Sequence, residues 1–274
     1  MQIDTLRSLP RPLAYVLPGG GALAAYQVGV LDALTAAGLR PDRVIGVSAG
    51  SLNAALFAWS SDSDGVRRIE RIWASVRRRD LLRFHPGRLA LALAGKRTSF
   101  LDNRHGIAFL RKHLGGRLIE HAPIPLTIIT TDLVTGRPFI LESGEVVFAI
   151  VASSAFPGVF PPVELAGHTL IDGGVVADVP LDVAAELGMA SVIVVAVPPL
   201  APAPIPQHPV AVVLRSSTWG VEAHGRTIVA RPPDGLRVVE IPTQPSSITT
   251  FAVGSASETI EVARQFTEAW LRSS

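Results

Sequence analysis

A serine between paired glycines is the first group in this sequence that could do chemistry. Gly46, Ser48 and Gly50 form a G-x-S-x-G motif at the end of a short apolar run, Arg43 to Val47, and a helical pattern follows. In that context a sharp turn from strand to helix holds the hydroxyl at the helix N-terminus, where an oxyanion is stabilised. The motif therefore predicts a serine nucleophile for acyl transfer. The alternative is a serine that only caps the helix.

A glycine run precedes this motif. Gly19, Gly20 and Gly21 follow the apolar run Leu13 to Leu17 and open a second helical pattern. Their spacing also fits the G-x-G-x-x-G/A fingerprint of dinucleotide binding. A dinucleotide site needs an acidic residue at the end of the second strand, and this chain has Ser48 there. We therefore favour an oxyanion hole, in which free backbone N–H groups stabilise the charge that develops on a substrate.

A serine nucleophile needs a base, and two kinds of partner are present. Histidine is the usual base, and His208 and His224 are the histidines that follow a plausible triad aspartate. Asp172 is the second candidate, because it precedes Gly173 and Gly174, which let other backbone come close. A plain turn is the alternative for this D-G-G segment. The residues by themselves leave both a Ser-Asp-His triad and a Ser-Asp dyad open.

The elements around these motifs alternate between strands and helices. After the first two strands and their helices, further strands are expected at 126–131, 138–141, 191–197 and 237–241, and helices at 67–76, 105–114, 181–187 and 255–271. This alternation predicts a three-layer α/β/α fold with a mostly parallel central sheet. We expect one domain over residues 1–274, with a proline-rich loop at 198–209 and a C-terminal part, 210–274, that ends in a helix.

The composition excludes several classes of function. Hydrophobic residues make up 48% of the 274 residues and charged residues 18%, which is typical of a globular enzyme and not of a disordered chain. The absence of cysteine excludes disulfides and thiolate metal sites, and no histidine and acid cluster has metal-ligand spacing. We expect neither a metal nor an organic cofactor. Because no apolar stretch has the length of a signal or membrane-spanning segment, we expect a cytoplasmic protein.

Positive charge is concentrated in one segment. Residues 67–80 contain six arginines and two acids, whereas the whole chain has a net charge of only +2. A nucleic-acid binder would carry basic residues interleaved with aromatic ones across a face, so we expect no nucleic-acid partner. The arginines of 67–79 flank apolar residues at helical spacing, which indicates either a solvated helix face or peripheral contact with anionic lipid. Residues 81–100 are either a core helix or a mobile cap.

Together and in this order, the motifs resemble those of the patatin-like phospholipases. The resemblance spans about residues 13–197 and includes the segments TDLVTG at 131–136 and ASSAFPGVFPP at 152–162. It implies a patatin-like fold and a catalytic dyad, with Ser48 as nucleophile and Asp172 as general base, so that no histidine is required. The oxyanion loop of the family corresponds here to Gly19, Gly20, Gly21 and Ala22.

The resemblance also implies an activity. It indicates a serine acyl hydrolase that cleaves fatty-acyl ester bonds of lipids or phospholipids through an acyl-enzyme. The family's loop commonly continues with a basic residue and a glycine, where this chain has Leu23 and Ala24. The alternatives are an α/β-hydrolase esterase with a Ser-Asp-His triad and a catalytically idle lipid-binding module. Two other acids, Asp178 and Asp182, are expected to be a turn residue and a helix N-terminal acid.

Overall fold

The central layer of the molecule is a twisted sheet. The computed structural model describes residues 2–77, 86–199, 205–244 and 253–273, and within them eight strands follow the order β5-β6-β3-β2-β1-β7-β8, with β4 also paired to β3. The strands are β1 (Leu13–Leu17), β2 (Arg43–Val47), β3 (Leu126–Asp132), β4 (Pro138–Leu141), β5 (Val163–Leu165), β6 (His168–Asp172), β7 (Ser191–Val194) and β8 (Arg237–Glu240).

Most of this sheet is parallel. The strands β3, β2, β1, β7 and β8 run in one direction, while β4 and β6 are antiparallel to β3. In the register of the central strands, Leu17 lies beside Gly46 and Val47 beside Ile129. The carboxyl ends of β1, β2 and β3 therefore meet at one edge of the sheet. Ligand sites of open parallel sheets form at that edge.

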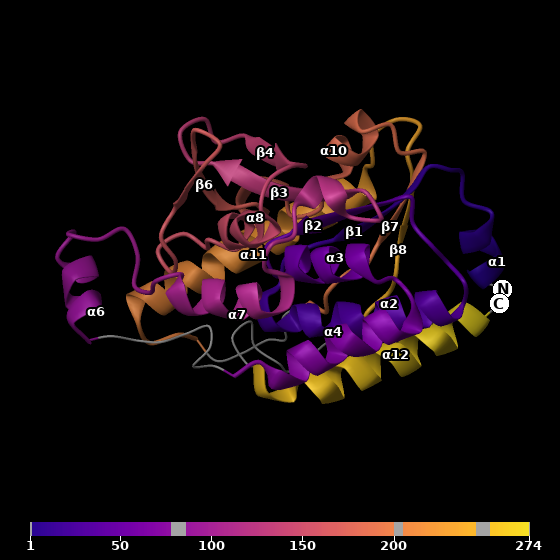
Figure 1. Ribbon diagram of the computed structural model, residues 1–274, viewed down its shortest axis with the longest axis horizontal. Coiled ribbons are helices and arrows are strands. Elements are labelled where there is room, and N and C mark those ends of the chain that lie inside the picture. Colours follow the sequence, from indigo (N-terminus) through magenta and orange to yellow (C-terminus); the bar gives the residue numbers. More distant parts are fainter. Residues whose placement is uncertain (1, 78–85, 200–204, 245–252, 274) are drawn as a thin grey trace.

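Helices cover both faces of the sheet (Figure 1). They are α1 (Gln2–Arg7), α2 (Ala25–Ala36), α3 (Ala49–Trp59), α4 (Ser63–Ser75), α6 (Pro86–Leu93), α7 (Arg104–Leu114), α8 (Val146–Ser153), α9 (Gly174–Ala177), α10 (Leu181–Glu186), α11 (Pro209–Ala230) and α12 (Ala256–Arg272). Short 3₁₀ turns η1 (Gly21–Ala24), η2 (Ile119–His121) and η3 (Val253–Ser255) complete the described elements. None of the described helices combines the length and hydropathy that crossing a membrane requires.

The side chains of β1 show why two helical layers are needed. Successive side chains of a strand point to opposite faces, and every side chain of β1 is buried. Tyr15 and Leu17 pack into a core formed with α2, α3, α4 and α12. Ala14 and Val16 pack into a second core with α9, α10 and the end of α11. This arrangement confirms the predicted three-layer α/β/α fold with a mostly parallel sheet.

Several predicted elements are confirmed, and two helices were missed. The first two strands and the hairpin of β3 and β4 lie where they were expected. No helix was predicted at 209–230, where α11 forms, because two glycines and several β-branched residues mask its periodicity. The helix α8 was also missed, since it is apolar on all sides. Asp172 is the last residue of β6, not part of a free turn.

The structure describes parts of the proline-rich loop, of residues 81–100 and of the basic segment 67–79. Residues 198–199 and 205–208 form no helix or strand, and Pro209 begins α11. The helix α6 stands apart from the sheet in Figure 1, and its Leu91 is exposed, so this part of 81–100 is not a core helix. Residues 81–85 lie outside the described residues. In α4 the large apolar side chains are buried, and Arg67, Arg68 and Arg71 are exposed. Arg78 and Arg79 lie outside the described residues.

Candidate active site

The turn between β2 and α3 gives Ser48 a strained backbone. Its φ of 51° and ψ of −128° place it in a region that residues with a side chain seldom adopt. The flanking glycines are required by space. A side-chain carbon on Gly50 would lie 2.2 Å from the carbonyl oxygen of Leu17, and one on Gly46 would lie 2.6 Å from Cβ of Ala54. The hydroxyl is therefore held at the N-terminus of α3, as a nucleophile elbow requires.

The Ser48 hydroxyl donates a hydrogen bond to Oδ2 of Asp172, with 2.6 Å between the oxygens. The second carboxylate oxygen, Oδ1, accepts a hydrogen bond of 2.8 Å from the N–H of Gly174. A side-chain carbon on Gly173 would lie only 2.3 Å from the carbonyl oxygen of Ile129, so this position must be glycine for β6 to pass so close to β3. The D-G-G segment thus orients the carboxylate toward the hydroxyl.

The environment of Asp172 tunes its acidity. Burial of the carboxyl raises its pKa from 3.8 to about 7, because a charge is poorly stabilised away from water. The hydrogen bonds from Ser48 and Gly174 act in the opposite direction, and the negative charge of Asp178 raises the pKa further. A carboxylate with a pKa near 7 is a much stronger base than an ordinary aspartate and is still ionised in part at neutral pH.

The glycine loop lies beside Ser48, since a side-chain carbon on Gly19 would lie 3.0 Å from Cβ of Ser48. Gly20 and Gly21 have φ values of 153° and 57°, which lets the chain turn sharply into η1. Among the described residues, no acceptor binds the N–H groups of Gly20, Gly21 or Ala22. The N–H of Gly19 instead donates to Oδ1 of Asp178 at 2.8 Å, which differs from the expectation of a free donor. The loop therefore offers three of its four expected donors.

A large pocket contains both groups. It has a volume of about 870 Å³, and its walls include Ser48, Asp172 and the glycine loop. Most of its other lining residues are apolar, among them Leu52, Trp73, Phe109, Ile150, Phe156 and Phe160. No histidine occurs among the described lining residues, and His208 and His224 are exposed on or beside α11. Across the described part of the chain, no three potential ligands are grouped as a metal site would need.

Comparison with known proteins identifies the family of this chain. The model of the patatin-like phospholipase family matches residues 15–185. The chain belongs to the patatin-like phospholipase family. Over 185 residues it is 32% identical to neuropathy target esterase sws of Drosophila melanogaster, covering 67% of this chain and 13% of the relative. Over 174 residues it is 32% identical to an uncharacterized NTE family protein of Mycobacterium tuberculosis, and the match covers 63% of this chain and 28% of the relative. The chain thus spans less than a third of the length of these relatives.

Solved structures give more distant likenesses. VipD from Legionella pneumophila is 15% identical, with a TM-score of 0.46 over 95% of this chain and 67% of that one. Human GIVD cytosolic phospholipase A2, in complex with methyl gamma-linolenyl fluorophosphonate, is 13% identical, with a TM-score of 0.44 over 98% of this chain and 60% of that one.

Ser153 is a residue of the candidate site that sequence reasoning did not identify. Its Oγ accepts the N–H of Ser48 at 2.8 Å and donates to the carbonyl oxygen of Ile129 at 2.6 Å. The strained residue Ser48 is thereby tied to β3 through the C-terminal residue of α8. The sequence signal for Ser153 was a serine at the end of an otherwise apolar segment. Such a serine can have many roles, so the sequence did not indicate this one.

The buried Asn53 supports the glycine loop of the candidate site. Its amide donates to the carbonyl oxygen of Ala24 and to Oε1 of Gln27, and its Oδ1 accepts the indole N–H of Trp73. Gln27 in turn donates to the carbonyl oxygen of Pro18. Both ends of the loop are thus held by one buried network from α2, α3 and α4. The sequence signal that could have revealed this network is the presence of Gln27 and Asn53 within otherwise apolar helices.

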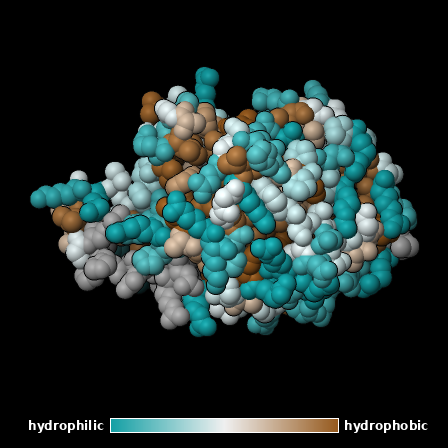
Figure 2. Space-filling model, viewed as in Figure 1, coloured by the Kyte–Doolittle hydropathy of each residue, from teal (hydrophilic) through white to brown (hydrophobic). Residues whose placement is uncertain are grey.

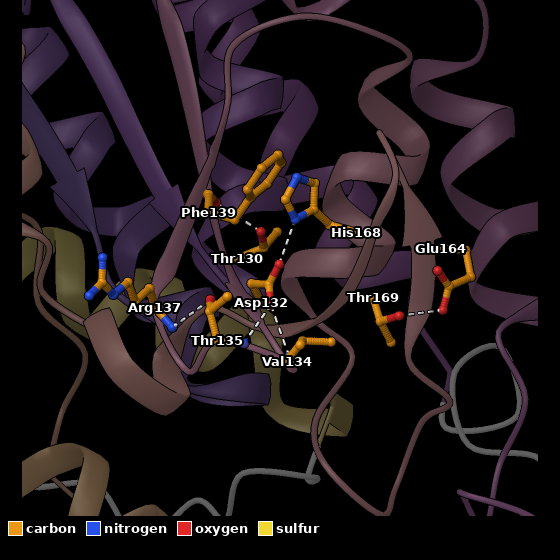
Figure 3. A network of polar contacts seen from close by, with 9 residues as sticks. All are labelled: Thr130, Asp132, Val134, Thr135, Arg137, Phe139, Glu164, His168 and Thr169. Carbon is orange, nitrogen blue, oxygen red and sulfur yellow. Dashed lines mark hydrogen bonds and ion pairs between the residues drawn. The ribbon is translucent and has the colours of Figure 1, made fainter.

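Asp132 has a structural role near the site (Figure 3). Its Oδ1 accepts the N–H groups of Val134 and Thr135, and its Oδ2 lies 2.5 Å from Nδ1 of His168. The His168 contact and the turn hydrogen bonds lower the pKa of Asp132 to about 2. The His168 ring packs on Phe139, with 4.2 Å between ring centroids. Asp132 therefore caps this turn, and it is not among the pocket residues.

The surface near this network is partly apolar. Figure 2 shows that hydrophilic side chains cover most of the visible face, and that hydrophobic ones gather over β6 and the adjoining loops. In the hairpin between β3 and β4, Leu133 is 50% exposed and Val134 is 83% exposed.

Proposed function

We propose that this chain is a serine acyl hydrolase that cleaves fatty-acyl ester bonds of lipids or phospholipids through a dyad of Ser48 and Asp172. The carrying observation is the 2.6 Å hydrogen bond between these side chains inside a large apolar pocket. Relatives named as an esterase and as patatin-like phospholipase domain-containing proteins support ester hydrolysis of lipids.

In the first half of the reaction, Oγ of Ser48 attacks the carbonyl carbon of the ester while Asp172 accepts the hydroxyl proton. The pair of electrons from the carbonyl bond moves to the oxygen, and the N–H groups of Gly20, Gly21 and Ala22 stabilise this oxyanion. As the tetrahedral intermediate collapses, the bond to the alcohol breaks. Asp172 returns its proton to the leaving alcohol, and Ser48 carries the acyl group.

The second half repeats these steps with water. Asp172 takes a proton from water, and the hydroxide attacks the acyl-enzyme carbonyl, giving a second oxyanion at the same donors. Its collapse breaks the bond to Oγ, Ser48 recovers a proton from Asp172, and the fatty acid leaves. Throughout, an acyl chain would pack against the apolar side chains from α3, α7 and α8. A pocket of this volume and polarity suits a long hydrocarbon chain better than a small polar ester.

The decisive experiment is labelling with a fluorophosphonate, read by mass spectrometry together with hydrolysis of a long-chain fatty-acyl ester. We expect the wild type to be labelled at Ser48 and to hydrolyse the ester. Ser48→Ala is expected to lose both properties, and Asp172→Asn to lose nearly all turnover. Ser154→Ala is the matched control, because Ser154 lines the same pocket, and among the described residues the carboxylate of Asp172 is hydrogen-bonded to Ser48 and Gly174 instead.

Each rival gives a different result. A Ser-Asp-His triad predicts that His208→Ala or His224→Ala abolishes turnover, whereas the dyad predicts near wild-type rates for both. An idle lipid-binding module predicts no labelling of the wild type. Labelling that persists in Ser48→Ala would refute the proposal.

We also propose a cytoplasmic protein that contacts anionic membranes peripherally through residues 67–79. The exposed arginines of α4 support this, since each basic residue near a charged surface contributes about 1 kcal/mol. Sedimentation with vesicles that contain anionic lipid should fall strongly when Arg67, Arg68 and Arg71 are replaced by Glu. Unchanged sedimentation of this variant would refute the contact.

A further inference from the structure

Asp178 is a second carboxylate in the pocket, and the mechanism above does not use it. It follows α9 directly and lines the same pocket as Ser48. Its Oδ1 accepts the N–H of Gly19 at 2.8 Å. A turn-capping aspartate would accept N–H groups a few residues away, but this hydrogen bond reaches across 159 positions of the chain. The turn role expected from the sequence does not account for it.

Gly19 is tightly enclosed between Asp178 and Ser48. A side-chain carbon on Gly19 would lie 2.9 Å from Oδ1 of Asp178 and 3.0 Å from Cβ of Ser48. Gly19 therefore fills the gap between the nucleophile and Asp178 without spare room. From the other side, Gly225 of α11 packs toward Asp178, since a carbon on Gly225 would lie 3.9 Å from Oδ2.

The two carboxylates of the pocket are also neighbours. A side-chain carbon on Gly174 would lie 3.2 Å from an oxygen of Asp172 and 3.2 Å from an oxygen of Asp178. One glycine thus separates the proposed general base from the residue that holds the loop. At this separation, in a pocket with mostly apolar walls, the charge of one carboxylate opposes ionisation of the other.

If the chain is the acyl hydrolase proposed above, we infer that Asp178 is a positioning residue of its oxyanion hole. Its carboxylate anchors Gly19 and thereby aims the N–H groups of Gly20 and Gly21 at the substrate carbonyl, and its negative charge makes Asp172 a stronger base. Because a misplaced donor stabilises an oxyanion poorly, the anchoring bond acts on the rate of the chemical step rather than on binding of the acyl chain.

The acidities of the two groups are consistent with this role. Burial raises the pKa of Asp178 to about 6, and the hydrogen bond from Gly19 limits the rise. The Gly19 hydrogen bond favours the ionised form of Asp178, and it is this charge that raises the pKa of Asp172. The other charged residues that line the pocket are Arg215, Glu222, Arg226 and Glu240. Glu222 and Arg226 pair with each other, and burial raises the pKa of Glu240.

Two variants separate the hydrogen bond from the charge. Asp178→Asn keeps an oxygen that can accept the Gly19 N–H but removes the charge. Asp178→Ala removes both. Asp182→Asn is the control, because Asp182 is exposed at the start of α10 and does not line the pocket.

The kinetic expectation follows from this design. For Asp178→Ala we expect kcat to fall about 10- to 100-fold with little change in KM, on the scale of a misaligned oxyanion donor. For Asp178→Asn we expect kcat at high pH to stay within about threefold of wild type, because the positioning bond remains. Its kcat/KM profile should rise at lower pH than that of the wild type, since the pKa of Asp172 falls. An equal loss in both variants, or an unmoved profile in Asp178→Asn, would overturn the inference.

Hydrogen exchange tests the anchor without any turnover. In the folded 274-residue chain, peptides that contain Gly19, Gly20 and Gly21 should exchange faster in Asp178→Ala than in wild type, and at the wild-type rate in Asp178→Asn and Asp182→Asn. Unchanged exchange in Asp178→Ala would refute the anchoring role. If instead the wild type shows no hydrolysis that depends on Ser48, the proposed function fails, and the exchange result still decides whether Asp178 holds the loop.

Discussion

The hydroxyl of Ser48 and the carboxylate of Asp172 are joined by a 2.6 Å hydrogen bond, although 124 positions separate them in the chain. The strained turn after β2 presents the hydroxyl, and the end of β6 presents the carboxylate. Because the bond joins a nucleophile to a carboxylate whose pKa is raised to about 7, the ionisation of Asp172 should control both activity and stability.

The pH profile is the first prediction. Asp172 accepts a proton only when it is ionised, so kcat/KM should rise with pH and level off above a pKa of about 7. Carboxyl groups ionise with little enthalpy and imidazolium with much more, so this rise should barely move with temperature. Rates of ester hydrolysis from pH 5 to 9 at two temperatures, with the Ser48→Ala rate subtracted, would measure it. A midpoint that moves strongly with temperature would indicate a histidine base instead.

Removal of the buried charge should stabilise the fold at high pH. The pKa of Asp172 is higher in the folded protein than its ordinary value of 3.8, so its stabilising contribution is complete below 3.8 and is lost as the pH rises through about 7. The asparagine side chain of Asp172→Asn is uncharged at both low and high pH. Its free energy of unfolding in urea should exceed that of wild type by roughly 2–4 kcal/mol at pH 8, and by much less at pH 4. An equal difference at the two pH values would contradict the raised pKa.

Ser153→Ala should loosen the nucleophile elbow. The change removes the acceptor of the Ser48 N–H and leaves a donor without a partner. The expected cost is about 1–3 kcal/mol in the free energy of unfolding, together with a lower kcat. Ser217→Ala is the control, since Ser217 is exposed on α11 and bonds only within its helix, and it should change stability by less than about 0.5 kcal/mol. Equal stability of the two variants would show that the Ser153 contact contributes little.

Gly50→Ala should prevent formation of the site. The added carbon would lie 2.2 Å from a backbone oxygen of Leu17, and neither β1 nor α3 can move without disturbing the core. We expect little soluble protein, and no labelling at Ser48 in what is recovered. Gly220→Ala meets nothing within 4 Å on an exposed part of α11, and it should be neutral or stabilise the helix by up to about 1 kcal/mol. A well folded, active Gly50→Ala protein would show that the elbow does not need the glycine.

The sequence by itself determined the local parts of the site. The glycines around Ser48, the glycine loop and the D-G-G segment have few local conformations, so their types and spacing indicate tight turns without knowledge of the rest of the chain. Alternating apolar runs were enough for β1, β2 and the three-layer fold. The apolar α8 and the glycine-containing α11 lack a clear helical period, and their structure depends on what packs around them.

Only the tertiary structure decided how these parts combine. The Ser48 contact with Asp172, the Ser153 contact with Ser48 and the Asp178 contact with Gly19 span between 105 and 159 positions. No local propensity encodes such contacts, because they form only when the strands pair in one register and bring distant turns to one edge of the sheet. The acidity of Asp172 depends on the same packing, since burial, not residue type, raises its pKa.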